Sequence, residues 1–216
     1  MSPGAGVEAV LALVVITDLL LLGSSRLRSC IRVVAVQGIM VSLLPLFLHG
    51  GEGAARAWAL TAGGVAVKGA VFPLVLLRVL REAGVHREVE PFVGHTLSVL
   101  VGASALVAAL WVETHLHLPA TAAGPLAVPV GLATMLIGLF VIVSRRKAIT
   151  QVLGYIVVEN GIYAVGVALV GGVPLLVELG VLLDVFVAVF IMSIAAYHIS
   201  REFDHIDVDQ LDRLRG

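Results

Sequence analysis

Four ionisable residues lie deep inside apolar stretches of the sequence, where a charge is costly. They are Asp18, Lys68, Glu159 and Asp184, and each surrounding stretch is long enough to cross a bilayer. An ionisable group at the bilayer centre costs at least about 2.5 to 3.5 kcal/mol on insertion scales, so those that persist usually face protein or water and serve a function. The chemistry that these residue types favour is the binding and release of protons within the membrane.

Glu159 has polar neighbours along its own helix. Gln151, Tyr155, Glu159 and Tyr163 recur at intervals of four, which places them on one helix face. At 1.5 Å rise per residue, this polar face is about 18 Å long. Burial favours the neutral carboxyl group and a nearby cation or water favours the carboxylate, which suits a group that takes and releases protons. We interpret the face as a proton relay; the alternative is a carboxyl group satisfied by a tyrosine of a neighbouring helix, with Gln151 only interfacial.

Lys68 lies five residues before Pro73 in the third apolar stretch. The proline ring clashes with the carbonyl four residues earlier and frees backbone acceptors beside the lysine. A buried lysine can lose its proton and regain it when a carboxylate approaches, so Lys68 could act as a movable positive charge. A permanent ion pair with Asp18 or Asp184 would balance the charge equally well. Asp184 has no polar neighbour on its own helix, so its partner, Lys68 or Glu159, must come from another helix.

The composition predicts an all-α, polytopic membrane protein. Of the 216 residues, 59% are hydrophobic and 13% are charged, with a mean hydropathy of +1.06, which is far too apolar for a soluble domain. A spanning helix needs roughly 20 mostly apolar residues. Apolar runs between charged or Pro/Gly-rich breaks predict seven such helices, at 5–23, 31–48, 57–79, 92–112, 126–144, 149–170 and 175–198. They leave no room for a soluble catalytic domain, and the net charge of −1 argues against nucleic acid as a partner.

Several other polar or small residues predict structure rather than chemistry. Small residues on one face of the fifth helix predict close packing with a neighbour; they are Gly131, Thr134 and Gly138. Pro45 predicts a kink in the second helix. His115 and His117 share a face, but no further histidine, cysteine or carboxylate has matching spacing, so no metal site is predicted.

The basic residues predict the orientation of the chain. Twelve of the fourteen lie after the first, third, fifth and seventh helices, and the other two are Arg56 and Lys68. Lysine and arginine near span ends favour the cytoplasmic side. We therefore expect the amino terminus outside and the carboxyl terminus in the cytoplasm, in the cell's inner (cytoplasmic) membrane.

One connection divides the predicted helices. Residues 113–128 contain two prolines and a glycine and are more polar than their surroundings, which predicts an extracytoplasmic link. It separates a four-helix part, 1–112, from a three-helix part, 129–200. Residues 201–216 are too polar to span and too short for a domain, so we expect a cytoplasmic docking tail.

Four places in the chain resemble the component E family of hydrogenase-4-type membrane arms. They are the segment Ser144 to Gly161 with its basic triplet and Glu159, Lys68 with Pro73, the run Leu175 to Gly180 leading to Asp184, and the tail Ile206 to Gly216. The resemblance covers nearly the whole chain. The last three helices are also similar to the K subunit of respiratory complex I and the C subunit of multisubunit cation/proton antiporters.

The resemblance implies a non-redox membrane subunit of an energy-converting [NiFe] hydrogenase or related formate-oxidising complex. It would lie beside antiporter-like subunits and peripheral hydrogenase-like subunits, which would carry the nickel-iron and iron-sulfur centres, with no cofactor in this chain. Its proton-transfer residues would be Glu159, Asp184, Lys68 and Asp18, with Tyr155, Tyr163 and Gln151. The alternatives are a purely structural assembly subunit whose charges pair permanently and a subunit of a cation/proton antiporter; an independent transporter is disfavoured because no inverted repeat is apparent.

Overall fold

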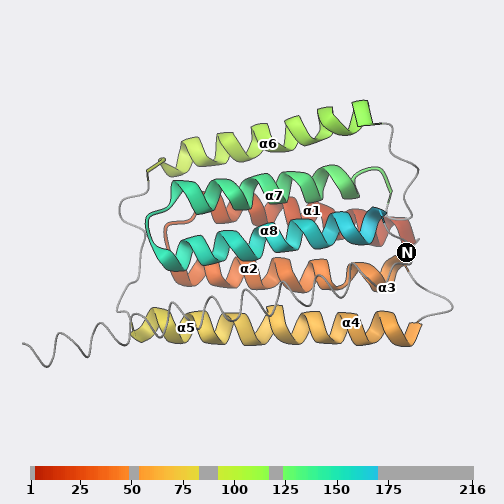
Figure 1. Cartoon of the computed structure of the whole chain (residues 1–216), viewed down its shortest axis with the longest axis horizontal. Coiled ribbons are helices and arrows are strands. Elements are labelled where there is room, and N and C mark those ends of the chain that lie inside the picture. The colour runs from red at the N-terminus through yellow and green to blue at the C-terminus, as the bar shows by residue number, and fades with distance from the viewer. Residues whose placement is uncertain (1–2, 49–53, 83–91, 117–123, 170–216) are drawn as a thin grey trace, which may run out of the picture.

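The described part of the chain is a bundle of helices. The computed structural model describes residues 3–48, 54–82, 92–116 and 124–169. Its elements are α1 (Pro3–Gly23), α2 (Leu27–Ser42), α3 (Leu44–Leu48), α4 (Ala54–Ala66), η1 (Val67–Val71), α5 (Phe72–Glu82), α6 (His95–Leu116), α7 (Ala127–Ser144) and α8 (Ala148–Leu169) (Figure 1). These ranges contain no strand, which agrees with the predicted all-α class.

Six helical stretches are long and apolar enough to cross a membrane. They are Gly4–Gly23, Leu27–Phe47, Ala57–Arg81, His95–His115, Ala127–Ser144 and Ala148–Leu169. Each corresponds to one of the first six predicted spans, with ends shifted by a few residues. The seventh predicted span, 175–198, lies outside the described residues, as do the connection 117–123 and the tail 201–216. The protein is therefore a multi-pass membrane protein.

Two prolines interrupt spans where the sequence predicts distortion. Pro45 has no N–H to donate, and α2 ends at Ser42, with the N–H of Leu43 bonding to the carbonyls of Ile39 and Met40 before α3 begins. In the third span Pro73 follows η1, a π-helical turn closed by the N–H of Phe72 on the carbonyl of Val67. The wider turn spreads the backbone next to the proline ring. The second span is interrupted at Leu43, two residues before Pro45, which is the kind of distortion that a proline predicts.

The helices α7 and α8 pack backbone to backbone. A Cβ atom added at Gly138 would lie 2.6 Å from the backbone nitrogen of Val158, and one added at Gly161 would lie 2.7 Å from the carbonyl oxygen of Gly131. Such distances leave no room for a side chain, so glycine is required at both contacts. The close packing predicted from the small residues of the fifth helix is confirmed.

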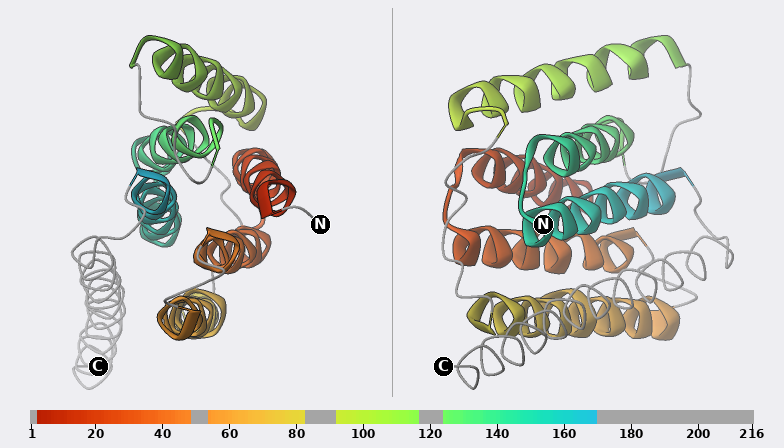
Figure 2. Two further views of the ribbon diagram at one scale, coloured as in Figure 1. Left: turned by 90° about the vertical axis from the view of Figure 1, so that its right-hand side faces the viewer. Right: turned by 60° about the vertical axis from the view of Figure 1, so that its left-hand side comes forward.

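The other helices are arranged around this pair. An end view places α1, α2, α7 and α8 together, with the third span and α6 on opposite sides (Figure 2). α1 packs on α7 and α2 packs on α8, so described helices from both sides of the predicted division form one bundle. The division into four-helix and three-helix parts stays a prediction.

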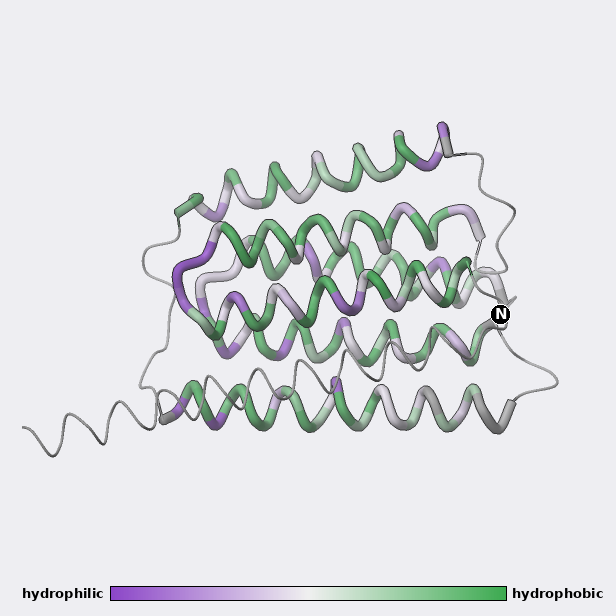
Figure 3. The backbone as a smooth tube through the Cα atoms, viewed as in Figure 1, coloured by the Kyte–Doolittle hydropathy of each residue, from purple (hydrophilic) through white to green (hydrophobic). Residues whose placement is uncertain are grey.

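The buried apolar side chains form two clusters, one toward each end of the bundle. The first, near the α1–α2 turn, includes Leu22, Leu27, Val34, Val141 and Val157. The second, toward the opposite end, includes Val14, Val41, Val130, Ala164 and Ala168. Along α1, α2, α7 and α8 a gap of several residues separates the members of one cluster from those of the other. Figure 3 shows hydrophilic turns in the middle of several otherwise hydrophobic helices.

Basic residues gather at one end of the bundle. The α1–α2 turn, the end of α5 and the α7–α8 turn all lie at the left of Figure 1, and they carry Arg26, Arg81 and Arg145. Arg145 is buried and donates a hydrogen bond from Nη2 to the carbonyl oxygen of Leu22, 3.1 Å away, in the last turn of α1. A cation at a helix carboxyl terminus satisfies an orphan carbonyl and complements the helix dipole.

Candidate functional site

Six buried polar side chains occupy the gap between the two apolar clusters. This polar layer consists of Asp18 on α1, Gln37 on α2, Lys68 in η1, Thr134 on α7, and Glu159 and Asn160 on α8. None is more than 4% exposed. The layer therefore crosses the bundle from helix to helix at mid-span and draws on five of the six described spans.

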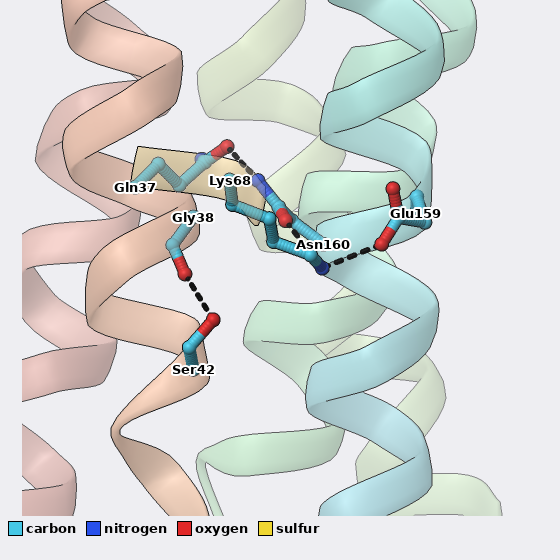
Figure 4. A network of polar contacts seen from close by, with 6 residues as sticks. All are labelled: Gln37, Gly38, Ser42, Lys68, Glu159 and Asn160. Atoms are coloured by element: carbon cyan, nitrogen blue, oxygen red, sulfur yellow. Dashed lines mark hydrogen bonds and ion pairs between the residues drawn. The ribbon is translucent and has the colours of Figure 1, made fainter. Parts of the chain in front are cut away.

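Lys68 is held by two consecutive residues of α8. Its Nζ lies 2.5 Å from Oε1 of Glu159 and donates a hydrogen bond to Oδ1 of Asn160, 3.1 Å away (Figure 4). Successive residues of an α-helix point about 100° apart, so an ammonium group placed between them reaches both. The ring of Tyr163 lies 5.0 Å from the same nitrogen, within the range of a cation–π contact.

A glycine lets the stem of Lys68 approach α2. A Cβ atom at Gly38 would lie 2.8 Å from Cβ of Lys68, so any larger residue would push η1 away. Gly38 directly follows Gln37, and its carbonyl accepts a 2.7 Å hydrogen bond from Ser42 (Figure 4). The widened turn at Lys68 and the glycine on α2 together bring the lysine to the layer.

Hydrogen bonds continue from Asn160 to the far side of the layer. Nδ2 of Asn160 donates to Oε1 of Gln37 at 3.2 Å, and Nε2 of Gln37 donates to Oδ1 of Asp18 at 2.7 Å. The other carboxylate oxygen of Asp18 accepts a 2.7 Å hydrogen bond from the hydroxyl of Thr134. The network is thus continuous from Glu159 through Lys68 to Asp18.

The layer has the chemical groups for proton exchange. It holds two carboxyl groups and one amine, so one positive charge faces two groups that can each be negative. Burial favours net neutrality, which one added proton would provide. A site of this composition can bind a proton and pass it between an amine and a carboxylate at 2.5 Å.

Only some of the residues predicted to share a polar face of α8 lie at the polar layer. Glu159 and Tyr163 lie at the layer, whereas Gln151 is half-buried and donates to the carbonyl oxygen of Arg145 at 3.2 Å. Tyr155 is 43% exposed on the surface of the bundle. Asp184 lies outside the described residues, so its predicted pairing with Lys68 or Glu159 stays a prediction.

The described helices carry two of the predicted acids, Asp18 and Glu159, and Lys68 forms an ion pair with Glu159. Asp18 instead accepts hydrogen bonds from Gln37 and Thr134, so an ion pair of Lys68 with Asp18, which the sequence left open as one alternative, is not formed. Sequence reasoning missed Gln37 and Asn160 as members of the site, and it assigned Thr134 only to packing. An uncharged amide within an apolar span was the available signal, because an amide buried in hydrocarbon also needs partners.

Metal ligation has no support within the described ranges. Residues 3–48, 54–82, 92–116 and 124–169 contain no cluster of three or more histidine, cysteine, aspartate or glutamate side chains that could hold a metal ion.

The sequence of this multi-pass membrane protein is similar to a known family and to individual proteins. Residues 126–216 match the family described as NADH-ubiquinone/plastoquinone oxidoreductase chain 4L. The chain is 35% identical over 205 residues to protein Rv0085 of Mycobacterium tuberculosis (strain H37Rv), covering 93% of this chain and 92% of that protein. It is 31% identical over 144 residues to hydrogenase-4 component E of Escherichia coli (strain K12), covering 67% of each. No solved structure matches.

The chain belongs to the hydrogenase-4 component E family. The region matching the chain 4L family contains Thr134, Glu159 and Asn160, whereas Asp18, Gln37 and Lys68 precede it. The polar layer therefore joins side chains of the matched region to side chains of the preceding helices.

Proposed function

We propose that this protein is a non-redox membrane subunit of a redox-driven ion-pumping complex of the energy-converting hydrogenase or formate-oxidising type. The observation that carries the proposal is the continuous polar layer across five spans, built around Lys68 and Glu159. The names of its relatives support the same class, because one is a hydrogenase-4 component and the matched family is an oxidoreductase chain.

In this function the layer is part of a lateral path for protons. Lys68 gives its proton to the carboxylate of Glu159, and its amine takes up a proton again when a carboxylate approaches and favours the charged form. Asp18 supplies a second acid at the other end, and Asp184 a further one in the seventh predicted span. Tyr163 beside Lys68, and Tyr155 and Gln151 toward the basic end, extend the polar face of α8.

The proposed partners are antiporter-like membrane subunits and peripheral hydrogenase-like subunits. The nickel-iron and iron-sulfur centres belong to those partners, and this chain carries no cofactor. The chain lies in the cytoplasmic membrane with its amino terminus outside and its basic end toward the cytoplasm, because lysine and arginine near span ends favour that side.

The test is to purify the tagged protein from its native membrane with its partners and to measure proton uptake during hydrogen or formate oxidation. Glu159→Gln should assemble and oxidise substrate but translocate fewer protons per turnover. Glu8→Gln is the matched control, because Glu8 is an exposed acid near the amino-terminal end of α1 and does not belong to the polar layer. Unchanged proton translocation in the assembled Glu159→Gln complex would remove Glu159 from the mechanism. Antiporter-like subunits without redox partners would point to a cation/proton antiporter instead.

One feature of the layer favours a second candidate, a structural assembly subunit. Lys68 and Glu159 are both buried and lie at ion-pair distance, as a permanent pair would. In that case Lys68→Met would leave a buried carboxylate unpaired and lower the amount of assembled complex. The ratio of protons moved to substrate oxidised would stay unchanged in the complexes that do form, which separates the two functions.

A further inference from the structure

The donors of the polar layer all point the same way between Lys68 and Asp18. Lys68 donates to Asn160, Asn160 donates to Gln37, and Gln37 donates to Asp18; Figure 4 shows the first two of these links. The end groups impose this order, since an ammonium group only donates and a carboxylate only accepts. The observed orientation of both amides fits an ammonium group at one end and a carboxylate at the other.

Amides transmit orientation but not protons. A carboxamide carries its donor and its acceptor on different atoms, and it does not titrate at ordinary pH. It can, however, exchange the positions of its oxygen and nitrogen by rotation about its terminal torsion, which is broad and roughly two-fold. Two amides in series between an amine and a carboxyl group can thus couple the ends while blocking proton passage between them.

We propose that the Gln37–Asn160 pair couples the protonation of Asp18 to that of Lys68 by reversing together. The observed hydrogen bonds correspond to a first state, with a carboxylate at Asp18 and an ammonium group at Lys68. In the reversed state protonated Asp18 donates to Oε1 of Gln37, Gln37 donates to Oδ1 of Asn160, and Asn160 donates to the neutral amine of Lys68. Both states contain three hydrogen bonds along the chain.

Mixed protonation states break this continuity. If Asp18 donates to Gln37 while Lys68 remains charged, two donors or two acceptors face each other at one junction, and a buried unsatisfied polar group is costly. A neutral Lys68 opposite a carboxylate at Asp18 keeps an N–H donor for Asn160, so the penalty falls on the state in which both ends carry a proton. The pair therefore disfavours protons on Asp18 and Lys68 at the same time.

The groups around both ends are accounted for among the described helices. Glu159 and Tyr163 face Lys68, and Thr134 joins Gln37 at Asp18. Other charged or titratable side chains on helices packed against α1 and η1 lie nearer the helix ends than the layer does. They include Arg32, Arg78, Arg81, His95, Glu113 and Arg145.

This inference deepens the proposed function and, as a step of proton transfer, rests on it. When Asp18 takes a proton from a hydronium ion, one O–H bond of that ion breaks, an O–H bond forms at Asp18, and the amide pair turns. Lys68 then gives its proton to the carboxylate of Glu159, with one N–H bond broken and one O–H bond formed. Loading at Asp18 thereby triggers transfer at Lys68 without any proton crossing the amides.

The experiment titrates Asp18 in the full-length chain in lipid nanodiscs by infrared difference spectroscopy, with Asp18→Asn identifying its carboxyl band. Lys68→Met should make Asp18 bind its proton about tenfold more tightly, the size expected for two sites that interact by one pK unit. In a Gln37→Met background most of that effect should vanish. Thr134→Val is the control, because it removes one hydrogen bond from Asp18 but leaves the amide pair intact, so the effect of Lys68→Met should persist.

A second measurement uses the unmutated chain and does not depend on the variants folding. Isotope-edited bands of the glutamine and asparagine side chains should change over the same pH range as the Asp18 band. The inference would be overturned if Lys68→Met had the same effect on Asp18 with and without Gln37. It would also be overturned if the amide bands stayed constant while Asp18 titrates. These are equilibrium measurements on the chain alone, so their failure is distinguishable from a failure of redox-driven pumping in the purified complex.

Discussion

Lys68 owes its place to two adjacent residues of α8 with different chemistry. Glu159 offers a charge and Asn160 a neutral acceptor, and the ammonium group contacts both. The charged contact balances the lysine electrostatically, whereas the neutral contact links it to Gln37 and Asp18. A change at either residue should therefore have a distinct consequence.

The Lys68–Glu159 pair should show strong coupling in a double-mutant cycle. Lys68→Met alone should lower the stability of the purified protein by about 3–5 kcal/mol, because it leaves a buried carboxylate unpaired. Adding Glu159→Gln should recover part of the loss. Unfolding in mixed detergent measures the four free energies, and a coupling below about 0.5 kcal/mol would contradict the pairing.

At the scale of elements, glycines set the spacing of the helices that carry the layer. Gly138 and Gly161 hold α7 against α8, and Gly38 admits Lys68 beside α2. Thr134 lies between Gly131 and Gly138 on α7 and donates a hydrogen bond to Asp18 of α1, so the helix that the glycines hold against α8 also carries a member of the polar layer. Packing and chemistry are therefore coupled through these small residues.

Replacing glycine with alanine at a packed and at an open position should separate the effect of helix packing on stability from the effect of helix propensity. Gly138→Ala should destabilise the protein by about 1–3 kcal/mol, since the new Cβ would meet the backbone of α8. Gly63→Ala is the matched control, because no atom lies within 4 Å of its Cβ position and alanine favours a helix by about 0.5–1 kcal/mol. Thermal denaturation in detergent measures both, and equal midpoints would contradict the contact between α7 and α8.

We expect the hydrogen bond from Arg145 to stabilise the last turn of α1. Arg145→Met should leave the carbonyl of Leu22 without this donor and cost about 1–3 kcal/mol. Arg146 is the control, because it is exposed and stacks on the ring of Phe92, with 4.5 Å from Cζ to the ring centroid. Hydrogen exchange in the last turn of α1 should rise in Arg145→Met but not in Arg146→Met. Equal exchange in the two variants would argue against a capping role.

At the scale of the whole molecule, the polar layer separates two apolar clusters and the basic residues lie at one end. An apolar core alone would hold the helices together without selecting their rotation about their own axes. The buried hydrogen bonds of the layer have fixed geometry, so they favour the rotation that pairs Asp18, Gln37 and Lys68 with α7 and α8.

The distribution of basic residues predicts which end of the bundle meets the cytoplasm. With Cys30 replaced by serine, a cysteine at Ser25 should react with a membrane-impermeant maleimide only after cells are opened. A cysteine at Thr114, near the other end of the bundle, should react in intact cells. The reverse pattern of labelling would show that the amino terminus lies in the cytoplasm.

The sequence by itself determined the features that depend on local chemistry and on the bilayer. Six predicted spans correspond to the six described ones because a membrane requires long apolar helices, whatever their partners. Distortion at Pro45 and close packing at Gly138 followed from the covalent structure of proline and the size of glycine. The buried acids and the lysine were recognisable for the same reason, since charge in an apolar span is costly.

Only the tertiary structure decided which of these groups meet. Lys68 and Glu159 are 91 positions apart, and the bonds from Gln37 to Asn160 and from Thr134 to Asp18 join residues 123 and 116 positions apart. Periodicity describes one helix at a time and carries no information about the rotation of one helix against another. That rotation is set by the contacts of glycines and by the buried hydrogen bonds, which is why two amides complete a site that the charged residues alone had marked.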